Sequence, residues 1–193
     1  REAHAFGRSF AAYFGASGQG TVSSVEIGNE PTQWDDSQYR ALFESAARGV
    51  READPEMRIA TCAAHARESD RYSKGLTDVF AGLEDLYDVI TVNAYALVEG
   101  WPTWRRSYPE DPSIDFLTRL EEIIAWRDGN APGKEIWITE FGWDATTQSP
   151  DPEGDFAQWE DVSDLQQAQY IVRSWLVFSA MDIDRAYLYW FND

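Results

Sequence analysis

The sequence TVSSVEIGNEP at residues 21–31 and the sequence EIWITEFGWD at residues 135–144 share one pattern. Each begins with a run of β-branched and apolar residues typical of a strand, and each run leads into a glutamate, Glu30 or Glu140. In parallel β/α folds the active site lies at the carboxyl ends of the strands. The two stretches therefore predict strands that present both glutamates at one edge of a parallel sheet.

Strand-like and helical stretches alternate along the whole chain. Strands are expected at residues 21–28, 57–63, 87–93, 135–139 and 185–191, and helices at 2–15, 37–53, 73–86, 113–128 and 165–181. Ser37 and Asp164 are the expected N-caps of two of these helices, and Asp128-Gly129-Asn130 is the expected stop of another. This order predicts a parallel sheet with helical crossovers, and no linker divides residues 1–193, so one domain is expected.

Two parallel architectures fit this order, an open doubly wound sheet and a (β/α)₈ barrel. No predicted strand is followed by a Gly-rich phosphate turn, so dinucleotide binding has no support. Every predicted strand end carries side chains able to bind or to do chemistry; they include Glu30, His65, Asn93, Tyr95, Glu140, Trp190 and Asn192. Polar residues at all the strand ends favour an α/β barrel over the open sheet.

The composition excludes several classes of partner. The formal net charge is −18, from 16 basic and 34 acidic residues. Such a surface repels nucleic acid and anionic membranes, whereas a neutral substrate meets no such repulsion. No apolar run reaches the roughly 18 residues of a membrane span. We therefore expect neither a nucleic acid nor a membrane as partner, although the acidity can also serve solubility alone.

Cysteine and histidine are too few to build a metal or disulfide site. Cys62 is the only cysteine, so no internal disulfide forms, and its apolar surroundings predict a buried structural thiol. His4 and His65 are the only histidines, and their separation is not a metal-ligand spacing. We expect no required metal and no cofactor.

Aromatic residues are the unusual part of the composition, at 15% of the chain with nine tryptophans. Five of these tryptophans lie in polar, Pro-, Gly- or Asp-rich stretches that resemble loops: Trp34, Trp101, Trp104, Trp143 and Trp159. A large apolar ring is costly to expose unless it binds something. Trp101, Trp104 and Trp143 are therefore candidates for contact with a bound ligand, with loop packing as the alternative.

Two carboxylates that face each other across a pocket suit the cleavage of a glycosidic bond. One must be protonated to deliver a proton to the leaving oxygen, and the other must be ionised to attack the anomeric carbon. A separation of about 5–5.5 Å gives retention of configuration, and about 6.5–9.5 Å gives inversion. Glu30 and Glu140 are the candidates for this pair.

Residues 25–31 (VEIGNEP) and 136–143 (IWITEFGW) resemble two signatures of the large clan of retaining glycoside hydrolases with a (β/α)₈ barrel. That clan includes cellulases, mannanases, xylanases, β-xylosidases and agarases. The resemblance implies that Glu30 ends strand 4 as acid/base and that Glu140 ends strand 7 as nucleophile. Two further predicted strands lie between them, as this numbering requires, and residues 185–191 then become strand 8.

The same resemblance implies roles for residues around the pair. Asn29 is similar to the asparagine that binds a sugar 2-hydroxyl, Tyr95 to a tyrosine that hydrogen-bonds the nucleophile, and Trp190 to the tryptophan that floors the sugar subsite. His65 and Asn93 can reach sugar hydroxyls or can have structural roles. Trp101, Trp104 and Trp143 become candidate platforms for stacking on the apolar face of a sugar. Asp144 and Asp193 are interpreted as ordinary loop acids.

The resemblance implies double displacement on β-linked poly- or oligosaccharides, and an extracellular, periplasmic or cell-surface location. Two alternatives stay open. One is a catalytically inactive, carbohydrate-binding barrel fragment, because a barrel does not guarantee catalysis. The other is a metal-dependent hydrolase, which needs a His/Asp cluster where only His65 is found.

The chain departs from the clan because strands 1–3 and helices 1, 2 and 8 have no counterpart in it. A (β/α)₈ barrel needs eight strands to close its ring, and five leave two unpaired edges. We expect the chain to be a segment of a longer enzyme, with residues 2–15 as helix 3 of the barrel. The remainder of the barrel is expected from the rest of the parent protein or from a partner chain, and the isolated chain is expected to fold poorly or to associate.

Overall fold

The structure, a computed structural model, describes residues 1–31, 34–62, 64–65, 76, 79–145, 153–154 and 157–189. Its elements follow one another along the chain as α1 (Glu2–Phe14), β1 (Ser24–Glu26), α2 (Asp36–Ala53), β2 (Arg58–Ala60), β3 (Ala64–His65), β4 (Val89–Asn93), α4 (Phe116–Asn130), β5 (Glu135–Phe141), α5 (Asp164–Ala180) and β6 (Arg185–Leu188). Strands and helices thus alternate much as the sequence predicts.

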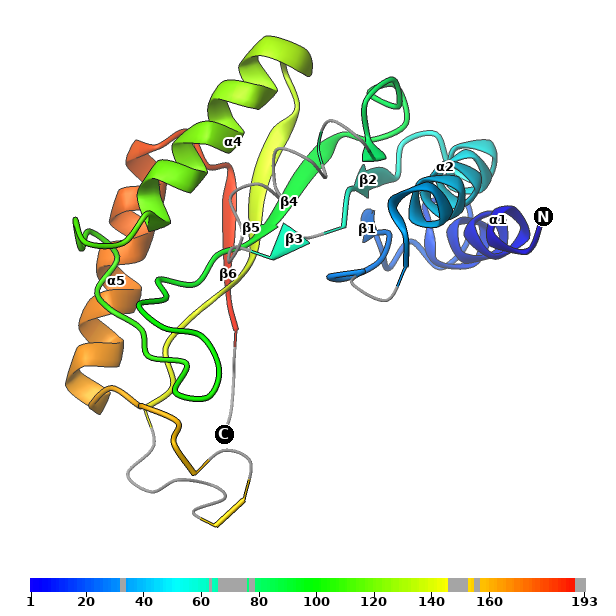
Figure 1. Cartoon of the computed structure of the whole chain (residues 1–193). Helices are drawn as coiled ribbons and strands as arrows, with labels where there is room; N and C mark the ends of the chain where they lie inside the picture. Colours follow the sequence, from blue (N-terminus) through cyan, green and yellow to red (C-terminus); the bar gives the residue numbers. More distant parts are fainter. Residues whose placement is uncertain are drawn as a thin grey trace.

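All strand pairs are parallel, and the sheet has the order β1-β2-β4-β5-β6, with the short β3 also paired to β4 (Figure 1). β2 lies within the second strand that the sequence predicts, 57–63, and the short β3 lies just beyond that range and pairs with the same neighbour, β4. The sheet curls into a half-barrel. This confirms the predicted α/β class and the partial (β/α)₈ barrel that spans strands 4–8 of the full architecture.

The helices pack on one face of the sheet, and the core lies between the two layers (Figure 1). Ile59, Ile90 and Ile136, from three adjacent strands, are at most 1% exposed and belong to one cluster with Phe43 of α2 and Phe178 of α5. Alternate residues of a strand point to opposite faces, so the opposite, concave face carries the hydrogen-bonded Glu26 and Thr91 together with a small apolar cluster of Ala60, Val89 and Trp137. The strand ends that carry the candidate site border this concave face.

The helix caps differ from the expectation by one or two residues. The carboxylate of Asp35 caps α2 by accepting from the backbone of Gln38 at 2.8 Å, while the hydroxyl of Ser37 donates to the same carboxylate. Ser163 caps α5 in a capping box with Gln166. The predicted caps Ser37 and Asp164 are therefore wrong, because a neighbouring side chain with better geometry caps each helix.

Two predicted helices also differ in their boundaries. Helix α4 begins at Phe116, three residues after the predicted start, and continues through the predicted stop to Asn130, whose side-chain amide donates to the carbonyl of Trp126 at 2.9 Å. Residues 80–86, predicted as the end of a helix, form successive turns in which Gly82 has a φ of +78°. A positive φ breaks an α-helix, so the prediction is wrong there. Residues 73–75 and 77–78 of that predicted helix lie outside the described residues.

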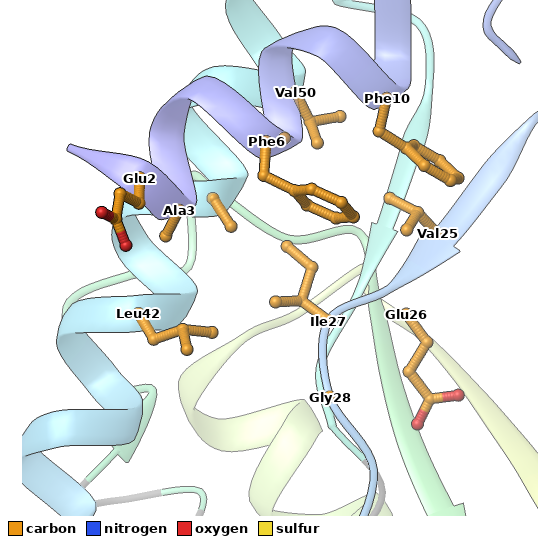
Figure 2. A pocket seen from close by; sticks show the side chains of 12 residues that line it. Glu2, Ala3, Phe6, Phe10, Val25, Glu26, Ile27, Gly28, Leu42 and Val50 are labelled. Atoms are coloured by element: carbon orange, nitrogen blue, oxygen red, sulfur yellow. The ribbon is translucent and has the colours of Figure 1, made fainter. Parts of the chain in front are cut away.

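The half-barrel has two open sides. In the described part of the chain β1 pairs only with β2, and β6 pairs only with β5. Beside β1 lies an apolar groove of about 440 Å³, the strand-edge groove, which α1, β1 and α2 line. Figure 2 shows Phe6 and Phe10 pointing across it toward Val25 and Ile27. At the other side, α5 exposes Leu176, which is 68% accessible.

None of the helices within the described residues combines the length and the apolar character that crossing a membrane requires. Cys62 is 7% exposed, which confirms the predicted buried thiol, and burial raises its pKa to about 12.

Candidate active site

Asn93, the last residue of β4, links the carboxyl-terminal ends of three strands, β1, β4 and β5. Its side chain is 0% exposed. Its amide nitrogen donates to the carboxylate of Glu30 at 2.9 Å and to the side-chain oxygen of Asn29 at 3.3 Å. Its amide oxygen accepts from the hydroxyl of Thr139 at 3.0 Å. Both ends of the amide are thus engaged, and they hold the turn after β1 against the end of β5.

Glu140 lies directly beside Asn93. The two residues are register partners in the parallel pair of β4 and β5. The backbone nitrogen of Ala94 donates to the carbonyl oxygen of Glu140 at 2.7 Å, which fixes the backbone at the point where its side chain leaves the strand. One residue, Asn93, therefore contacts Glu30 through its side chain and is aligned with Glu140 through the sheet. The structure brings both predicted glutamates to one edge.

Tyr95 supplies a hydrogen bond to the side chain of Glu140. Its hydroxyl donates to the carboxylate at 2.7 Å. Burial of the phenol raises the pKa of Tyr95 above its ordinary value, and the hydrogen bond to Glu140 and the charge of that carboxylate raise it further. The phenol therefore keeps its proton across the physiological range. It is a permanent donor toward Glu140.

Glu30 occupies a tight turn after β1. Its φ is +40°, in the left-handed region that residues other than glycine rarely adopt. Gly28, two residues earlier, has a φ of +96°, and a Cβ there would lie 3.0 Å from the ring of Tyr39. The hydroxyl of Tyr39 in turn donates to the carbonyl of Ile27. Strained backbone of this kind gathers at functional sites, where the surrounding structure holds it in place.

A second group of hydrogen-bonded polar side chains lies earlier along the strands than Glu30 and Asn93. The hydroxyl of Thr91 has two acceptors within reach of its single proton, the carboxylate of Glu26 at 3.1 Å and the carbonyl of Thr61. The backbone nitrogen of Thr91 donates to the hydroxyl of Thr61 at 3.0 Å. Figure 2 shows Glu26 on the opposite side of β1 from Ile27. The sequence analysis did not single out Glu26, although its alternation with Val25 and Ile27 is the signal that places it on the concave face.

The predicted tryptophan platforms have different surroundings. Trp143 is 4% exposed, and its indole nitrogen donates to the carbonyl of Ser107 at 2.8 Å, so its ring packs into the core and presents no face to a ligand. The ring of Trp104 lies 5.9 Å from that of Trp159. Trp101 is 56% exposed. Trp101 is thus the most accessible of the three predicted platforms.

Some predicted residues cannot be placed. The backbone of His65 belongs to β3, but its side chain lies outside the described residues. Trp190 and Asp193 also lie outside them. Among the side chains that the structure describes, no three His, Cys, Asp or Glu residues gather as a metal site.

Arg106 is a further residue that the sequence analysis missed. Its side chain is 12% exposed, and it contacts Asp144 at 2.8 Å and the ring of Tyr95 at 4.7 Å. Asp144, interpreted from the sequence as an ordinary loop acid, is therefore one half of a largely buried ion pair. The only signal in the sequence is the Arg105-Arg106 pair beside tryptophans, which does not say which arginine turns inward.

Comparison with solved structures gives several similar folds. A glucosidase from Croceicoccus marinus matches with a TM-score of 0.70 and 16% identity, over 97% of this chain and 37% of that chain. A family 39 glycoside hydrolase from the gut symbiont Bacteroides cellulosilyticus WH2 matches with a TM-score of 0.62 and 19% identity, over 96% and 36%. A family 44 endoglucanase from Clostridium acetobutylium matches with a TM-score of 0.64 and 15% identity, over 96% and 46%.

No protein-family model matches the chain, and no curated protein matches it in sequence. The chain spans less than half the length of these three structural neighbours. The neighbours are glycoside hydrolases of several families, and at these identities the similarity shows the fold. The chain therefore has a glycosidase-like fold that corresponds to part of the barrel of these neighbours.

Proposed function

We propose that the protein is a retaining glycoside hydrolase, with Glu140 as nucleophile and Glu30 as acid/base. The observation that carries the proposal is the arrangement around Asn93 and Tyr95. One amide holds Glu30 at the exit of β1, and one phenol donates to Glu140 at the exit of β5. Two glutamates at the ends of β1 and β5, each held by a separate polar residue, fit the two roles of a retaining enzyme.

The proposed reaction has two steps. In the first, a carboxylate oxygen of Glu140 bonds to the anomeric carbon, the glycosidic C–O bond breaks, and the carboxyl group of Glu30 gives its proton to the leaving oxygen. In the second, Glu30 takes a proton from water, the water oxygen bonds to the anomeric carbon, and the bond to Glu140 breaks. The hydroxyl of Tyr95 keeps the carboxylate of Glu140 in one orientation throughout.

The proposed substrate is a poly- or oligosaccharide with β-linkages. Asn29 is exposed on the same turn as Glu30 and is assigned to a sugar hydroxyl. Trp101 and Trp104, on the loop after β4, are assigned to stacking on sugar rings. Trp190 and His65, whose side chains lie outside the described residues, are assigned to further sugar contacts on the basis of the resemblance alone. Asn93 is assigned a positioning role, because the hydrogen bonds described above already engage both ends of its amide.

The rest of the barrel is assigned to further strands that pack on the two open sides. The strand-edge groove is apolar, and Phe6 on its rim is 72% exposed. A strand parallel to β1 would place its outward side chains in this groove, as in a closed barrel. The remaining strands come from the rest of the parent protein or from a partner chain, and an extracellular, periplasmic or cell-surface location accompanies this function.

The test is hydrolysis of a panel of 4-nitrophenyl β-glycosides by the chain and its variants. We expect Glu140→Gln to abolish turnover. Glu30→Gln should slow substrates with poor leaving groups far more than 2,4-dinitrophenyl glycosides, because the latter need no proton. Proton NMR of the first product should show the β-anomer. Turnover that survives Glu140→Gln, or a first product with the α-anomer, would overturn the assignment.

A second candidate function, carbohydrate binding without turnover, is favoured by one observation. The open sheet exposes Tyr187 and Tyr189, which are 44% and 45% accessible, and the ring of Tyr187 lies 6.2 Å from that of Trp137. Exposed aromatic rings beside a polar face can hold a sugar. Calorimetric binding of an oligosaccharide that is unaltered by Glu30→Gln and Glu140→Gln, without hydrolysis, would favour this candidate.

A further inference from the structure

The loop after β4 folds back on itself as a hairpin arm, residues 96–107. Its two sides meet in an antiparallel bridge between Leu97 and Arg106, and the backbone nitrogen of Val98 donates to the carbonyl of Arg105 at 2.9 Å. The arm begins directly after Tyr95 and carries Trp101 near its tip. It therefore connects the proposed nucleophile's hydrogen-bond donor with the most accessible of the predicted sugar platforms.

Arg106 is the point where this arm meets the exit of β5. One of its terminal nitrogens donates to the carboxylate of Asp144 at 2.8 Å and to the carbonyl of Gly142 at 3.2 Å. Its guanidinium carbon lies 4.7 Å from the ring centre of Tyr95 and 5.8 Å from that of Trp159. A single side chain of the arm thus contacts the end of the strand that bears Glu140, the ring of Tyr95, whose hydroxyl donates to Glu140, and the ring of Trp159.

The burial of Arg106 shows that this contact is more than a surface ion pair. Its side chain is 12% exposed and that of Asp144 is 21% exposed. A buried charge is costly unless it is paired and hydrogen-bonded, and removing one partner leaves the other uncompensated. A guanidinium can lie flat on an aromatic ring while it donates in its own plane, which an ammonium cannot do.

The neighbouring Arg105 provides an internal contrast. Its side chain is 48% exposed, and it approaches Glu99 at 3.7 Å and Glu160 at 3.9 Å. Exposed pairs at such distances contribute little to stability. Arg105 and Arg106 have the same chemistry and adjacent places in the chain, but only Arg106 turns toward Tyr95.

We propose that Arg106 is a positioning residue that holds the phenol of Tyr95 against Glu140 and fixes the hairpin arm to the exit of β5. The kinetic part of this inference rests on the proposed hydrolase function, and the structural part does not. Through Tyr95 the arm and the nucleophile are coupled, because a shift of the guanidinium moves both the ring beneath it and the loop that carries Trp101. Arg106 acts through Tyr95 and does not touch the reacting atoms.

The test uses Arg106→Met and Arg106→Lys, with Arg105→Met as the matched control. The chain is labelled with ¹³C at the tyrosine ζ carbon, whose chemical shift responds to phenol hydrogen bonding, and Tyr95→Phe identifies the signal of Tyr95. In the unaltered chain Glu140→Gln should move this signal. In the Arg106→Met background the same change should move it by less than half as much, whereas in the Arg105→Met background the full movement should remain.

Kinetics give the second readout. Arg106→Met should lower kcat on an aryl β-glycoside by about ten- to a hundredfold with little change in KM, because small misplacements of reacting groups have effects of that order. Arg106→Lys should recover only part of the loss, and Arg105→Met should stay within about twofold of the parent. Asp144→Asn, which weakens the ion pair and keeps Arg106, replaces Arg106→Met if that variant fails to fold. In the Asp144→Asn background, too, Glu140→Gln should move the Tyr95 signal by less than half as much as in the unaltered chain.

The outcomes separate the two proposals. A chain without any turnover contradicts the proposed function, while the tyrosine signal still decides the role of Arg106. A full response of Tyr95 to Glu140→Gln in both the Arg106→Met and the Asp144→Asn backgrounds overturns the positioning role. An equal loss of response in Arg105→Met also overturns it, because the effect would then belong to the arm as a whole.

Discussion

The side-chain amide of Asn93 donates to the carboxylate of Glu30 at 2.9 Å, across 63 residues of sequence. The same amide accepts from Thr139, which precedes Glu140 on β5. This relationship ties the two proposed catalytic strand ends together. Alignment of Glu30 relative to Glu140 therefore depends on a residue that needs no contact with the substrate.

We predict that Asn93→Ala lowers both turnover and stability. The hydroxyl of Thr139 and the carboxylate of Glu30 lose a buried partner, which costs about 1–3 kcal/mol of unfolding free energy. Urea unfolding measures the stability and an aryl glycoside assay the turnover. Asn130→Ala is the control, because it removes an exposed amide bonded to the Trp126 carbonyl and should cost less than about 0.5 kcal/mol. Equal losses in the two variants would contradict the role of Asn93.

Tyr95→Phe should lower kcat by about ten- to a hundredfold, because the carboxylate of Glu140 loses its phenol donor. The pKa of Tyr95 is raised, so the donor is present at every pH below the ordinary tyrosine value of about 10. The loss should therefore be the same at pH 6 and pH 9. Tyr108→Phe, whose ring packs 6.3 Å from that of Tyr170, is the control and should leave kcat unchanged. A loss that disappears toward pH 9 would mean that the phenol titrates early.

Cys62 should make the protein less stable in alkali. Burial raises its folded pKa from 9.0 to about 12, so the unfolded state releases the proton first and stability falls as the pH rises between these values. At pH 10 the loss from this one group is on the order of 1 kcal/mol. Urea unfolding at pH 8 and pH 10 should show a smaller decrease for Cys62→Ala than for the parent. Identical decreases, or rapid thiol labelling of the folded chain at pH 8, would contradict a buried thiol.

The open sides of the half-barrel should make the isolated chain associate. Phe6 beside β1 and Leu176 on α5 are 72% and 68% exposed, and an unpaired strand edge recruits further strands. Sedimentation velocity should show mass that increases with concentration, and Phe6→Glu or Leu176→Glu should reduce it. Val98→Glu, at a 43% exposed position in the hairpin arm, should not. A compact monomer with a sharp thermal transition at all concentrations would refute this expectation.

The strand ends were predictable from sequence because their signal is local. Val25 to Glu30 and Ile136 to Glu140 each combine an apolar run with a polar end, and parallel strands necessarily bring such ends to one edge. The number of predicted strands between the two glutamates then assigned them to strands 4 and 7 of the barrel. These features need no knowledge of which loops meet.

The contacts between loops were not predictable in the same way. Trp143 lies in a polar stretch but is buried, because the carbonyl that bonds its indole comes from Ser107, 36 residues earlier. Arg106 and Asp144 are likewise 38 residues apart, and nothing local distinguishes Arg106 from Arg105. The central place of Asn93 follows from three strand ends that converge in space. Such pairings depend on tertiary packing and leave no periodic pattern in the sequence.

The central claim is that Glu140 is the nucleophile, and covalent trapping tests it most directly. A 2-deoxy-2-fluoro β-glycoside with a dinitrophenyl leaving group slows the second step of double displacement, so the sugar remains attached to the carboxylate that attacked. Peptide mass spectrometry of the treated chain should find the fluorosugar on Glu140, and Glu140→Gln should remove it. A label on any other residue, or undiminished labelling of Glu140→Gln, would contradict the account.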